Sequence, residues 1–333
     1  MNISELGEFE LIDLLRVMVD NSMDINPSSQ PELILGIGDD AAAWQGDPSM
    51  QLATSDTLVQ DIHFILEFIS WEELGWKAMA VNLSDIAAMG GLPRYALVSL
   101  SLPTSTEIDS VTDLYRGMIE LSGRFDTIIA GGNISTAPQV IINITVLGNT
   151  EKEKHILTRS GARIGDKIAV TGHLGASAAG LKILKEKIRL NSESEKILKQ
   201  AFLRPNPRIQ EGQILVEKGV RSAIDISDGL IADLGHICKA SKVGARINTS
   251  RIPVHPEVTS NFGEDTLALA LSGGEDYELL FTAPIEIINN VKHTVSCPVT
   301  IIGDITDDFP GEVVVMDDKG YRLSLKSSGW KHF

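Results

Sequence analysis

Aspartate and glutamate residues occur in short clusters beside glycine, serine or threonine, and this composition favours the binding of hard cations. The clusters lie at residues 36–40, 54–57, 82–85, 225–229 and 273–276. Magnesium prefers carboxylate, water and phosphate oxygens, and it usually takes one or two carboxylates from each of several segments while substrate phosphates complete its shell. The clusters therefore predict phosphate chemistry assisted by metal ions.

Each cluster taken alone is also typical of a tight turn, because Asp bonds its own backbone and Gly tolerates positive φ. Together they favour a shared site. Two carboxylates about 4 Å apart repel by roughly 4 kcal/mol at an effective dielectric near 20, so a converging set needs cations. Ligand sites in α/β proteins lie at strand ends, and we expect a strand to meet a loop, or a helix to end, at Asp40, Asp56, Asp85, Asp225 and Asp228.

The familiar phosphate-binding signatures are missing from the sequence. There is no G-x-x-x-x-G-K-[ST] loop and no G-x-G-x-x-G that opens a helix, and the protein-kinase motif set is absent. The acidic run 304–308 lacks the Gly and Glu that an EF-hand needs. Any nucleotide site must therefore be built in another way.

The elements expected to position the clusters form two α/β units. In the first we expect helices at 8–19, 70–89 and 106–125, with Ser70 as the N-cap of the second, and strands at 33–36, 51–54, 95–102, 127–130 and 139–148. In the second we expect helices at 176–185, 192–202 and 229–240 and strands at 167–171, 223–225, 277–282, 299–305 and 312–316. The polar stretch 149–154 suggests domains at 1–150 and 151–333.

Charge and composition narrow the class of protein. The 333 residues include 45 acidic and 29 basic side chains, a formal charge of −16, which argues against nucleic acid as a partner. The first residues lack the pattern of a secretion signal, and no apolar stretch approaches the roughly 20 residues that cross a bilayer. With only Cys238 and Cys297, neither a disulfide framework nor a zinc site is expected. We therefore expect a cytoplasmic protein without membrane association.

Taken together, the motifs resemble the thiamine-monophosphate kinase family, within the superfamily of aminoimidazole ribonucleotide synthetase and selenophosphate synthetase. The matching residues are 7–9, 36–41, 55–58, 63–64, 77–85, 159–162, 225–230, 273–277 and 329–333. The resemblance implies an α/β (α+β) fold with an N-terminal mixed sheet that forms a dimeric barrel-like core with flanking helices. It also implies a homodimer, with a C-terminal α/β sandwich domain completing the active-site cleft.

The resemblance also implies roles for individual residues. Several Mg²⁺ ions would be held by Asp40, Thr54, Ser55, Asp56, Asp85, Asn133, Asp225 and Asp228. Asp39 would support these ligands without contacting the ions itself. ATP would be bound by Gly132, Asn133, Arg159 and Ser227, and thiamine monophosphate by His63, Glu275 and Trp330. Many family members carry Asp where this chain has Asn133, a change that would remove one metal ligand. Potassium is a further candidate ion.

The implied activity is ATP-dependent phosphorylation of thiamine monophosphate to thiamine diphosphate, the last step of thiamine diphosphate biosynthesis. Transfer would be direct and in line, with Asp56, Asp85, Asp225, Asp228 and Arg159 as the catalytic set. Three other functions stay open: a different ATP-dependent synthetase, a metal-dependent phosphohydrolase, and a nucleotide-binding protein without turnover. Structural roles also stay open for the three substrate residues, as a packed histidine, a turn cap and a core tryptophan.

Overall fold

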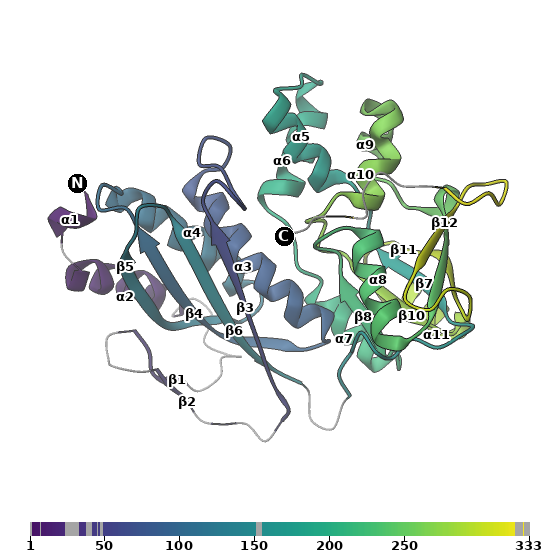
Figure 1. Ribbon diagram of the computed structural model, residues 1–333. Helices are drawn as coiled ribbons and strands as arrows, with labels where there is room; N and C mark the ends of the chain where they lie inside the picture. The colour runs from purple at the N-terminus through teal and green to yellow at the C-terminus, as the bar shows by residue number, and fades with distance from the viewer. Residues whose placement is uncertain are drawn as a thin grey trace. The chain divides into compact units, whose positions relative to one another are not determined.

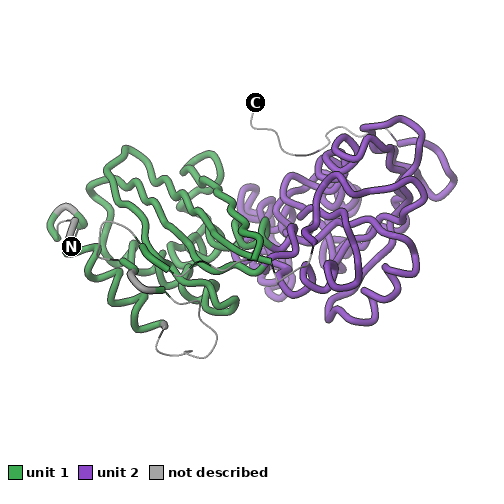
Figure 2. The backbone as a smooth tube through the Cα atoms, turned by 90° about the horizontal axis from the view of Figure 1, so that it is seen from below, with its two compact units in different colours: residues 1–86, 92–153 green, residues 87–91, 154–333 purple. Residues whose placement is uncertain are grey.

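A computed structural model describes residues 2–6, 8–23, 33–37, 42–44, 46, 49–150, 155–323 and 329. The chain separates into two compact units, residues 1–86 with 92–153 and residues 87–91 with 154–333 (Figure 2). Each unit contains a mixed sheet with helices, which confirms the expected α/β class. Within the described ranges, no helix is both long and apolar enough to span a bilayer.

Unit 1 is a mixed sheet with helices against one face (Figure 1). Its described strands run in the order β3-β6-β4-β5, in which only β4 and β5 are parallel, and β1 and β2 form a separate pair. Its elements are α1 (Ile3–Leu6), α2 (Glu8–Met23), β1 (Leu33–Leu35), β2 (Ala43–Trp44), β3 (Gln51–Val59), α3 (Trp71–Ala88), β4 (Leu92–Leu102), α4 (Ile108–Gly123), β5 (Ile128–Thr136) and β6 (Ile141–Asn149).

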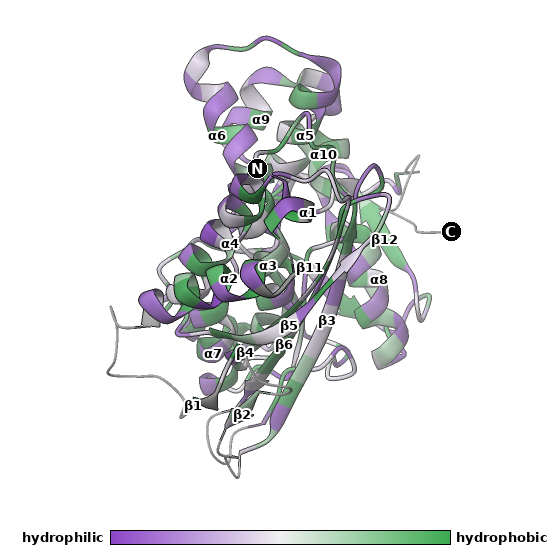
Figure 3. Ribbon diagram, turned by 90° about the vertical axis from the view of Figure 1, so that its left-hand side faces the viewer, coloured by the Kyte–Doolittle hydropathy of each residue, from purple (hydrophilic) through white to green (hydrophobic). Residues whose placement is uncertain are grey.

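The two faces of the unit 1 sheet differ in polarity because side chains alternate along each strand. Leu58, Ile144 and Val98 are buried on the face that the helices cover. Hydrophobic and hydrophilic stretches alternate along α2, as expected for a helix with one packed side (Figure 3). On the opposite face, Asn143 donates to the hydroxyls of Ser55 and Thr57, so this face is polar.

Helix α3 begins where the sequence predicts. Ser70 and Glu73 form a reciprocal capping box: the Ser70 amide donates to the Glu73 carboxylate at 2.9 Å, and the Glu73 amide donates to the Ser70 hydroxyl at 3.2 Å. Gly75 lets α3 approach α4 closely, since a Cβ there would meet the Leu114 carbonyl oxygen at 1.8 Å. The helix that carries Asp85 is therefore fixed at its start and along its length.

Unit 2 contains a mixed sheet of order β12-β9-β11-β7-β10-β8 with helix α8 packed against it. A second apolar cluster lies among α5, α6 and α9. Its elements are β7 (Lys167–Thr171), α5 (Ala176–Glu186), α6 (Ser192–Leu203), α7 (Ile209–Glu217), β8 (Ser222–Asp225), α8 (Leu230–Ser241), β9 (Gly244–Asn248), η1 (Thr249–Arg251), α9 (Pro256–Asn261), η2 (Gly263–Asp265), α10 (Thr266–Ser272), β10 (Leu279–Ala283), α11 (Ile285–Lys292), β11 (Val299–Thr306) and β12 (Val313–Met316).

Two predicted strands continue five or more residues beyond their expected ends, and several elements were missed. The strand predicted at 51–54 continues to Val59, so placing Asp56 at a strand end was wrong: it lies inside β3. The strand predicted at 127–130 continues to Thr136 and includes Gly132 and Asn133. Strand β9 and helices α7, α9, α10 and α11 were not predicted. Polar and glycine-rich strands resemble loops in the sequence, because the partners that hold them come from distant elements.

Candidate functional site

Three predicted metal ligands of unit 1 meet on the helix-facing side of β3. Thr54 and Asp56 lie two positions apart on this strand, and the Thr54 hydroxyl donates to the carboxylate of Asp85 on α3. The Asp56 carboxyl lies close enough to that of Asp85 for the two groups to interact. Burial, and then the charge of Asp85, raises the pKa of Asp56 to about 6. The carboxylates of Asp56 and Asp85 thus place two groups of like charge close together.

Asn82 holds this arrangement together, although no specific role was predicted for it. Its Oδ1 accepts the backbone N–H of Asp56 at 3.1 Å, and its Nδ2 donates to the Ala78 carbonyl at 3.1 Å. Because β3 is an edge strand of the described sheet, half of its amides lack a partner strand, and Asn82 satisfies one of them. The spacing of Asn82 and Asp85, three residues apart on one helix, could have indicated this joint role.

Ser55 lies on the other face of the sheet from its neighbours. Its hydroxyl is 3.0 Å from that of Thr145 and accepts from the Asn143 amide at 3.2 Å. The Ser55 side chain therefore does not join the Thr54–Asp56–Asp85 group. The period of two along a strand imposes this separation.

Gly132 and Asn133, the predicted ATP residues of unit 1, lie on β5 at the opposite edge of the described sheet from β3. Strands β6 and β4 lie between these edges, and a spacing of about 4.8 Å per strand puts them roughly 14 Å apart. Asn133 is exposed and pairs in register with Ser99. Within one copy, Asn133 and Asp56 are thus too far apart to bind the same ion.

His63 follows β3 in a tight turn. Its Nδ1 accepts the Val59 amide at 3.1 Å, and its own amide donates to the Val59 carbonyl at 2.9 Å. This histidine therefore shapes the turn through its own hydrogen bonds.

In unit 2, the second acidic cluster forms the connection from β8 to α8. Asp225 is buried at the end of β8, and Ser227 and Asp228 follow in a loop that leads into the helix. The predicted location of Asp225 at a strand end is thus confirmed. Arg159 is close enough to α8 for its charge to act on His236, and its carbonyl accepts from Ser241 at 2.8 Å.

A buried carboxylate that the sequence reasoning missed, Asp233, organises this loop. Its Oδ2 accepts the backbone N–H groups of Ser227, Asp228 and Gly229 at 3.1, 3.1 and 3.0 Å. Burial and the charges of Asp225 and Asp228 raise the pKa of Asp233 to about 8, and the amides offset this only in part. The signal for it is the spacing of Asp228 and Asp233, which puts a carboxylate in the first turn of α8.

His236 lies beside the same group. One ligand atom each from Asp228, Asp233 and His236 lies within 4.8 Å of the others. Burial, together with the positive charges of Arg159 and Lys239, lowers the pKa of His236. The neighbourhood of Asp228 thus combines carboxylates, an imidazole and a guanidinium.

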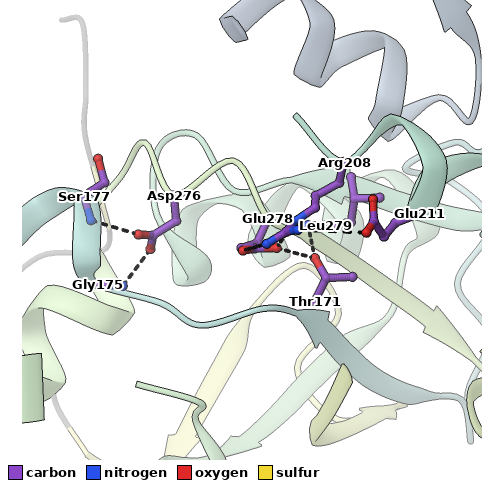
Figure 4. A network of polar contacts seen from close by, with 8 residues as sticks. All are labelled: Thr171, Gly175, Ser177, Arg208, Glu211, Asp276, Glu278 and Leu279. Atoms are coloured by element: carbon purple, nitrogen blue, oxygen red, sulfur yellow. Dashed lines mark hydrogen bonds and ion pairs between the residues drawn. The ribbon is translucent and has the colours of Figure 1, made fainter. Parts of the chain in front are cut away.

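The loop that carries Glu275 is bonded directly to the Asp228 loop. The Glu275 amide donates to the Ser227 carbonyl at 2.8 Å, and Glu275 itself has a left-handed φ of 65°. Asp276 accepts the amides of Gly175 and Ser177 at 2.8 and 3.3 Å (Figure 4). Burial raises the pKa of Asp276 to about 7, although these two bonds lower it. The Asp276 side chain therefore ties this loop to the start of α5.

Glu278, three residues beyond Glu275, also holds this part of the chain in place. The Glu278 carboxylate accepts from the Arg208 guanidinium and, at 2.7 Å, from the Thr171 hydroxyl (Figure 4). Gly172 has a φ of 58°, and a Cβ there would come within 2.0 Å of this carboxylate. The ion pair is nearly buried and fixes the start of β10 against β7.

Two predicted site residues, Asp40 and Trp330, lie outside the described residues, as does Asp39. Gly329, which precedes Trp330 in the sequence, is described. A Cβ on Gly329 would meet the Asp228 carbonyl oxygen at 2.5 Å and the Ala232 side chain at 2.8 Å. The chain thus returns to the Asp228 loop near its last residues.

Comparison with known proteins gives matches to both units. The model of the AIR synthase related protein N-terminal domain matches residues 38–150, and that of its C-terminal domain matches residues 163–316. A thiamine-monophosphate kinase of Aquifex aeolicus (strain VF5) is 36% identical over 336 aligned residues that span 100% of both chains.

Comparison with solved structures gives the same family. A thiamine-monophosphate kinase from Stenotrophomonas maltophilia K279a superposes with a TM-score of 0.81 at 33% identity, covering 94% of this chain and 96% of that one. AaThiL complexed with AMPPCP and TMP superposes with a TM-score of 0.77 at 35% identity, covering 100% and 99%. The family resemblance and the enzyme class expected from the sequence are confirmed by these matches: the chain belongs to the thiamine-monophosphate kinase family.

Proposed function

We propose that this chain transfers the γ-phosphoryl group of ATP to thiamine monophosphate, giving ADP and thiamine diphosphate. The observation that carries the proposal is the full-length likeness to a relative solved with AMPPCP and TMP. AMPPCP is an ATP analogue whose β–γ bridging oxygen is replaced by carbon, so that complex pairs an unreactive donor with the acceptor. The reaction completes thiamine diphosphate biosynthesis, and we place it in the cytoplasm.

The described carboxylates fit magnesium. Asp56 and Asp85 offer hard oxygen donors, and burial, followed by the charge of Asp85, raises the pKa of Asp56. Asp225 and Asp228 offer a second oxygen set in unit 2. When bound, magnesium neutralises phosphate oxygens during transfer. Several such ions, with Thr54 and Asp40 as further ligands, belong to this proposal, as does a potassium ion. The Ser55 side chain, which lies on the other face of the sheet, is left out of this set.

The acceptor needs little activation from the protein. An oxygen of the thiamine phosphate attacks the γ-phosphorus in line, the bond from that phosphorus to the bridging oxygen breaks, and ADP leaves with the electron pair. The attacking oxygen is already anionic near neutral pH, so no general base is required. Arg159 and Ser227 bind ATP, with the Arg159 guanidinium balancing charge on the leaving group. His63, Glu275 and Trp330 bind thiamine monophosphate.

We assign the two predicted domains, 1–150 and 151–333, to one active site: the first supplies the Asp56–Asp85 pair and the dimer contact, the second Asp225 and Asp228. The sheet order supports a homodimer as part of this proposal. Asn133 and Asp56 lie on opposite edges of the described sheet, and the approach of β5 of a second copy to β3 would bring both residues to one ATP. The polar open face of the sheet suits such a contact.

The test is incubation of purified protein with ATP, magnesium and thiamine monophosphate, following ADP and thiamine diphosphate by chromatography. We expect both products only when all three components are present. Release of inorganic phosphate without thiamine diphosphate would indicate a phosphohydrolase. ATP consumption with another acceptor would indicate a different synthetase. Binding of ATP without turnover would contradict any kinase function.

A further inference from the structure

The buried carboxylate of Asp233 has no role in the function proposed above. Asp233 lies in the first turn of α8, and the residue is 2% exposed. A single oxygen, Oδ2, accepts three successive backbone N–H groups, those of residues 227–229, at 3.0 to 3.1 Å. The Asp233 amide also donates to the Gly229 carbonyl at 3.0 Å, which closes the loop onto the helix.

These contacts fix the direction of the loop. The amides at the start of a helix are natural partners for any nearby carboxylate. Asp233 accepts all three amides of a segment that Asp225 and Asp228 flank. Gly229, with a φ of 122°, supplies the turn into α8, where a Cβ would meet the Ser272 carbonyl carbon at 3.0 Å.

The loop is coupled to the segment that carries Glu275. The amides of Glu275 and Tyr277 donate to the carbonyls of Ser227 and Ile226 at 2.8 and 2.9 Å. A Cβ on Gly274 would come within 2.3 Å of the Ser227 carbonyl oxygen, so the two segments are packed backbone to backbone. A change in the conformation of residues 227–229 must therefore displace Glu275 as well.

We propose that Asp233 is a positioning residue: its carboxylate gathers the three amides of residues 227–229 and thereby sets the placement of Ser227, Asp228 and Glu275 for phosphoryl transfer. The catalytic part of this proposal rests on the proposed kinase function. The rival role is a third metal ligand beside Asp228 and His236, whose ligand atoms lie within 4.8 Å of it.

Two substitutions separate these roles. Asp233→Asn keeps an oxygen that can accept the amides, and Asp233→Ala removes it. Asp317→Ala is the matched control, because the Asp317 Oδ1 also accepts two backbone amides, those of Lys319 and Tyr321 at 2.9 and 2.8 Å, but in an exposed turn. We measure kcat, KM for thiamine monophosphate, the magnesium concentration for half-maximal rate, and amide hydrogen exchange of residues 226–229.

For a positioning residue, Asp233→Ala lowers kcat by about 100-fold, the scale of a 1 Å misplacement, and Asp233→Asn regains about tenfold. The magnesium concentration for half-maximal rate rises in Asp233→Ala, because Asp228 is displaced, and stays within about threefold of wild type in Asp233→Asn, which keeps Asp228 in place. Exchange at 226–229 accelerates in Asp233→Ala and returns toward wild type in Asp233→Asn. Asp317→Ala stays within about twofold of wild type in every measurement.

The proposal is overturned if Asp233→Asn is as inactive as Asp233→Ala and weakens magnesium as strongly as Asp228→Asn, the behaviour of a ligand. It is equally overturned if Asp233→Ala leaves exchange at 226–229 unchanged. If Asp233→Ala does not fold, Asp233→Asn decides between the roles through the magnesium titration. Should wild type make no thiamine diphosphate, the proposed function fails, while hydrogen exchange still tests the loop.

Discussion

At the scale of single residues, the pair Asp56 and Asp85 shows how a functional arrangement can oppose stability. Their carboxylates share a partly buried site with the Thr54 hydroxyl, and burial with like charge raises the pKa of Asp56 to about 6. A group whose pKa is higher in the folded chain than in the unfolded chain binds protons better when folded. In the absence of metal, folding stability therefore falls as pH rises from about 4 through about 6.

This sign gives a prediction for magnesium. Protons compete with the cation for Asp56, so magnesium should raise the melting temperature more at about pH 8 than at about pH 5. Thermal unfolding with magnesium and with a chelator, at both pH values, measures the difference. An equal magnesium shift at the two pH values would show that Asp56 does not take part in metal binding.

Replacing Asp56 separates activity from stability. Asp56→Asn should lower kcat by about 10²–10³-fold, because a charged group at the phosphates is lost. The same change removes the repulsion with Asp85, so the metal-free melting temperature should rise by roughly 2–4 °C for about 1 kcal/mol. Asp318→Asn, in the exposed turn after β12, serves as a control that changes neither. Retained turnover in Asp56→Asn would remove this residue from the proposed site.

At the scale of elements, sequence predicts the helices that carry the site better than the strands. The Ser70 cap and the end of α3 near Gly90 follow from local signals, and both are confirmed. Strands β3 and β5 were predicted too short because Thr-Ser-Asp-Thr and Gly-Gly-Asn read as loop sequences. Their partners, such as Asn82 for the Asp56 amide, come from distant parts of the chain, so the local sequence carries no signal for them.

The crossing of α3 and α4 depends on two glycines, which gives a stability prediction. A Cβ on Gly117 would lie 1.9 Å from the Glu72 carbonyl oxygen, so Gly117→Ala must push the helices apart. We expect a loss of about 1–3 kcal/mol and, because α3 carries Asp85, reduced turnover at temperatures where the protein is still folded.

Gly235 in α8 provides the matched control for that experiment. A Cβ there meets nothing within 4 Å, so Gly235→Ala should stabilise the chain by about 0.4–1 kcal/mol through the unfolded state. Denaturant unfolding of both variants compares the two helical glycines directly. Equal effects of the two substitutions would mean that the close approach of α3 to α4 is not energetically important.

At the scale of the whole molecule, the sheet order explains why the sequence could predict candidate site residues but not which of them lie close together. Thr54, Asp56 and Asp85 meet within unit 1, and Asp228, Asp233 and His236 meet within unit 2. Asn133, at the far edge of the described sheet of unit 1, does not join the group of that unit. The order of strands is set by long-range pairing that residue spacing does not encode. In the proposed dimer, a second copy would supply what one copy lacks.

A shared site can be tested by mixing two inactive variants. Asp56→Asn and Asn133→Leu alter residues on opposite edges of the sheet. In the proposed dimer each site takes Asp56 from one copy and Asn133 from the other, so a mixed dimer would have one doubly altered site and one intact site. Half of the dimers formed from an equal mixture are mixed, and the expected activity is about a quarter of wild type. Coexpression with separate affinity tags, followed by purification on both tags, gives the mixed dimer alone at about half of wild-type activity.

The control for this experiment uses two lesions on the same edge. Asp56→Asn mixed with Asp85→Asn damages the same half of every site, because both residues belong to one cluster on β3 and α3. That mixture should stay inactive although its dimers form equally well, as light scattering would verify. Recovery in the first mixture and none in the second requires Asn133 to act across the dimer contact. No recovery in either, with dimers present, would restrict each site to one copy and remove Asn133 from it.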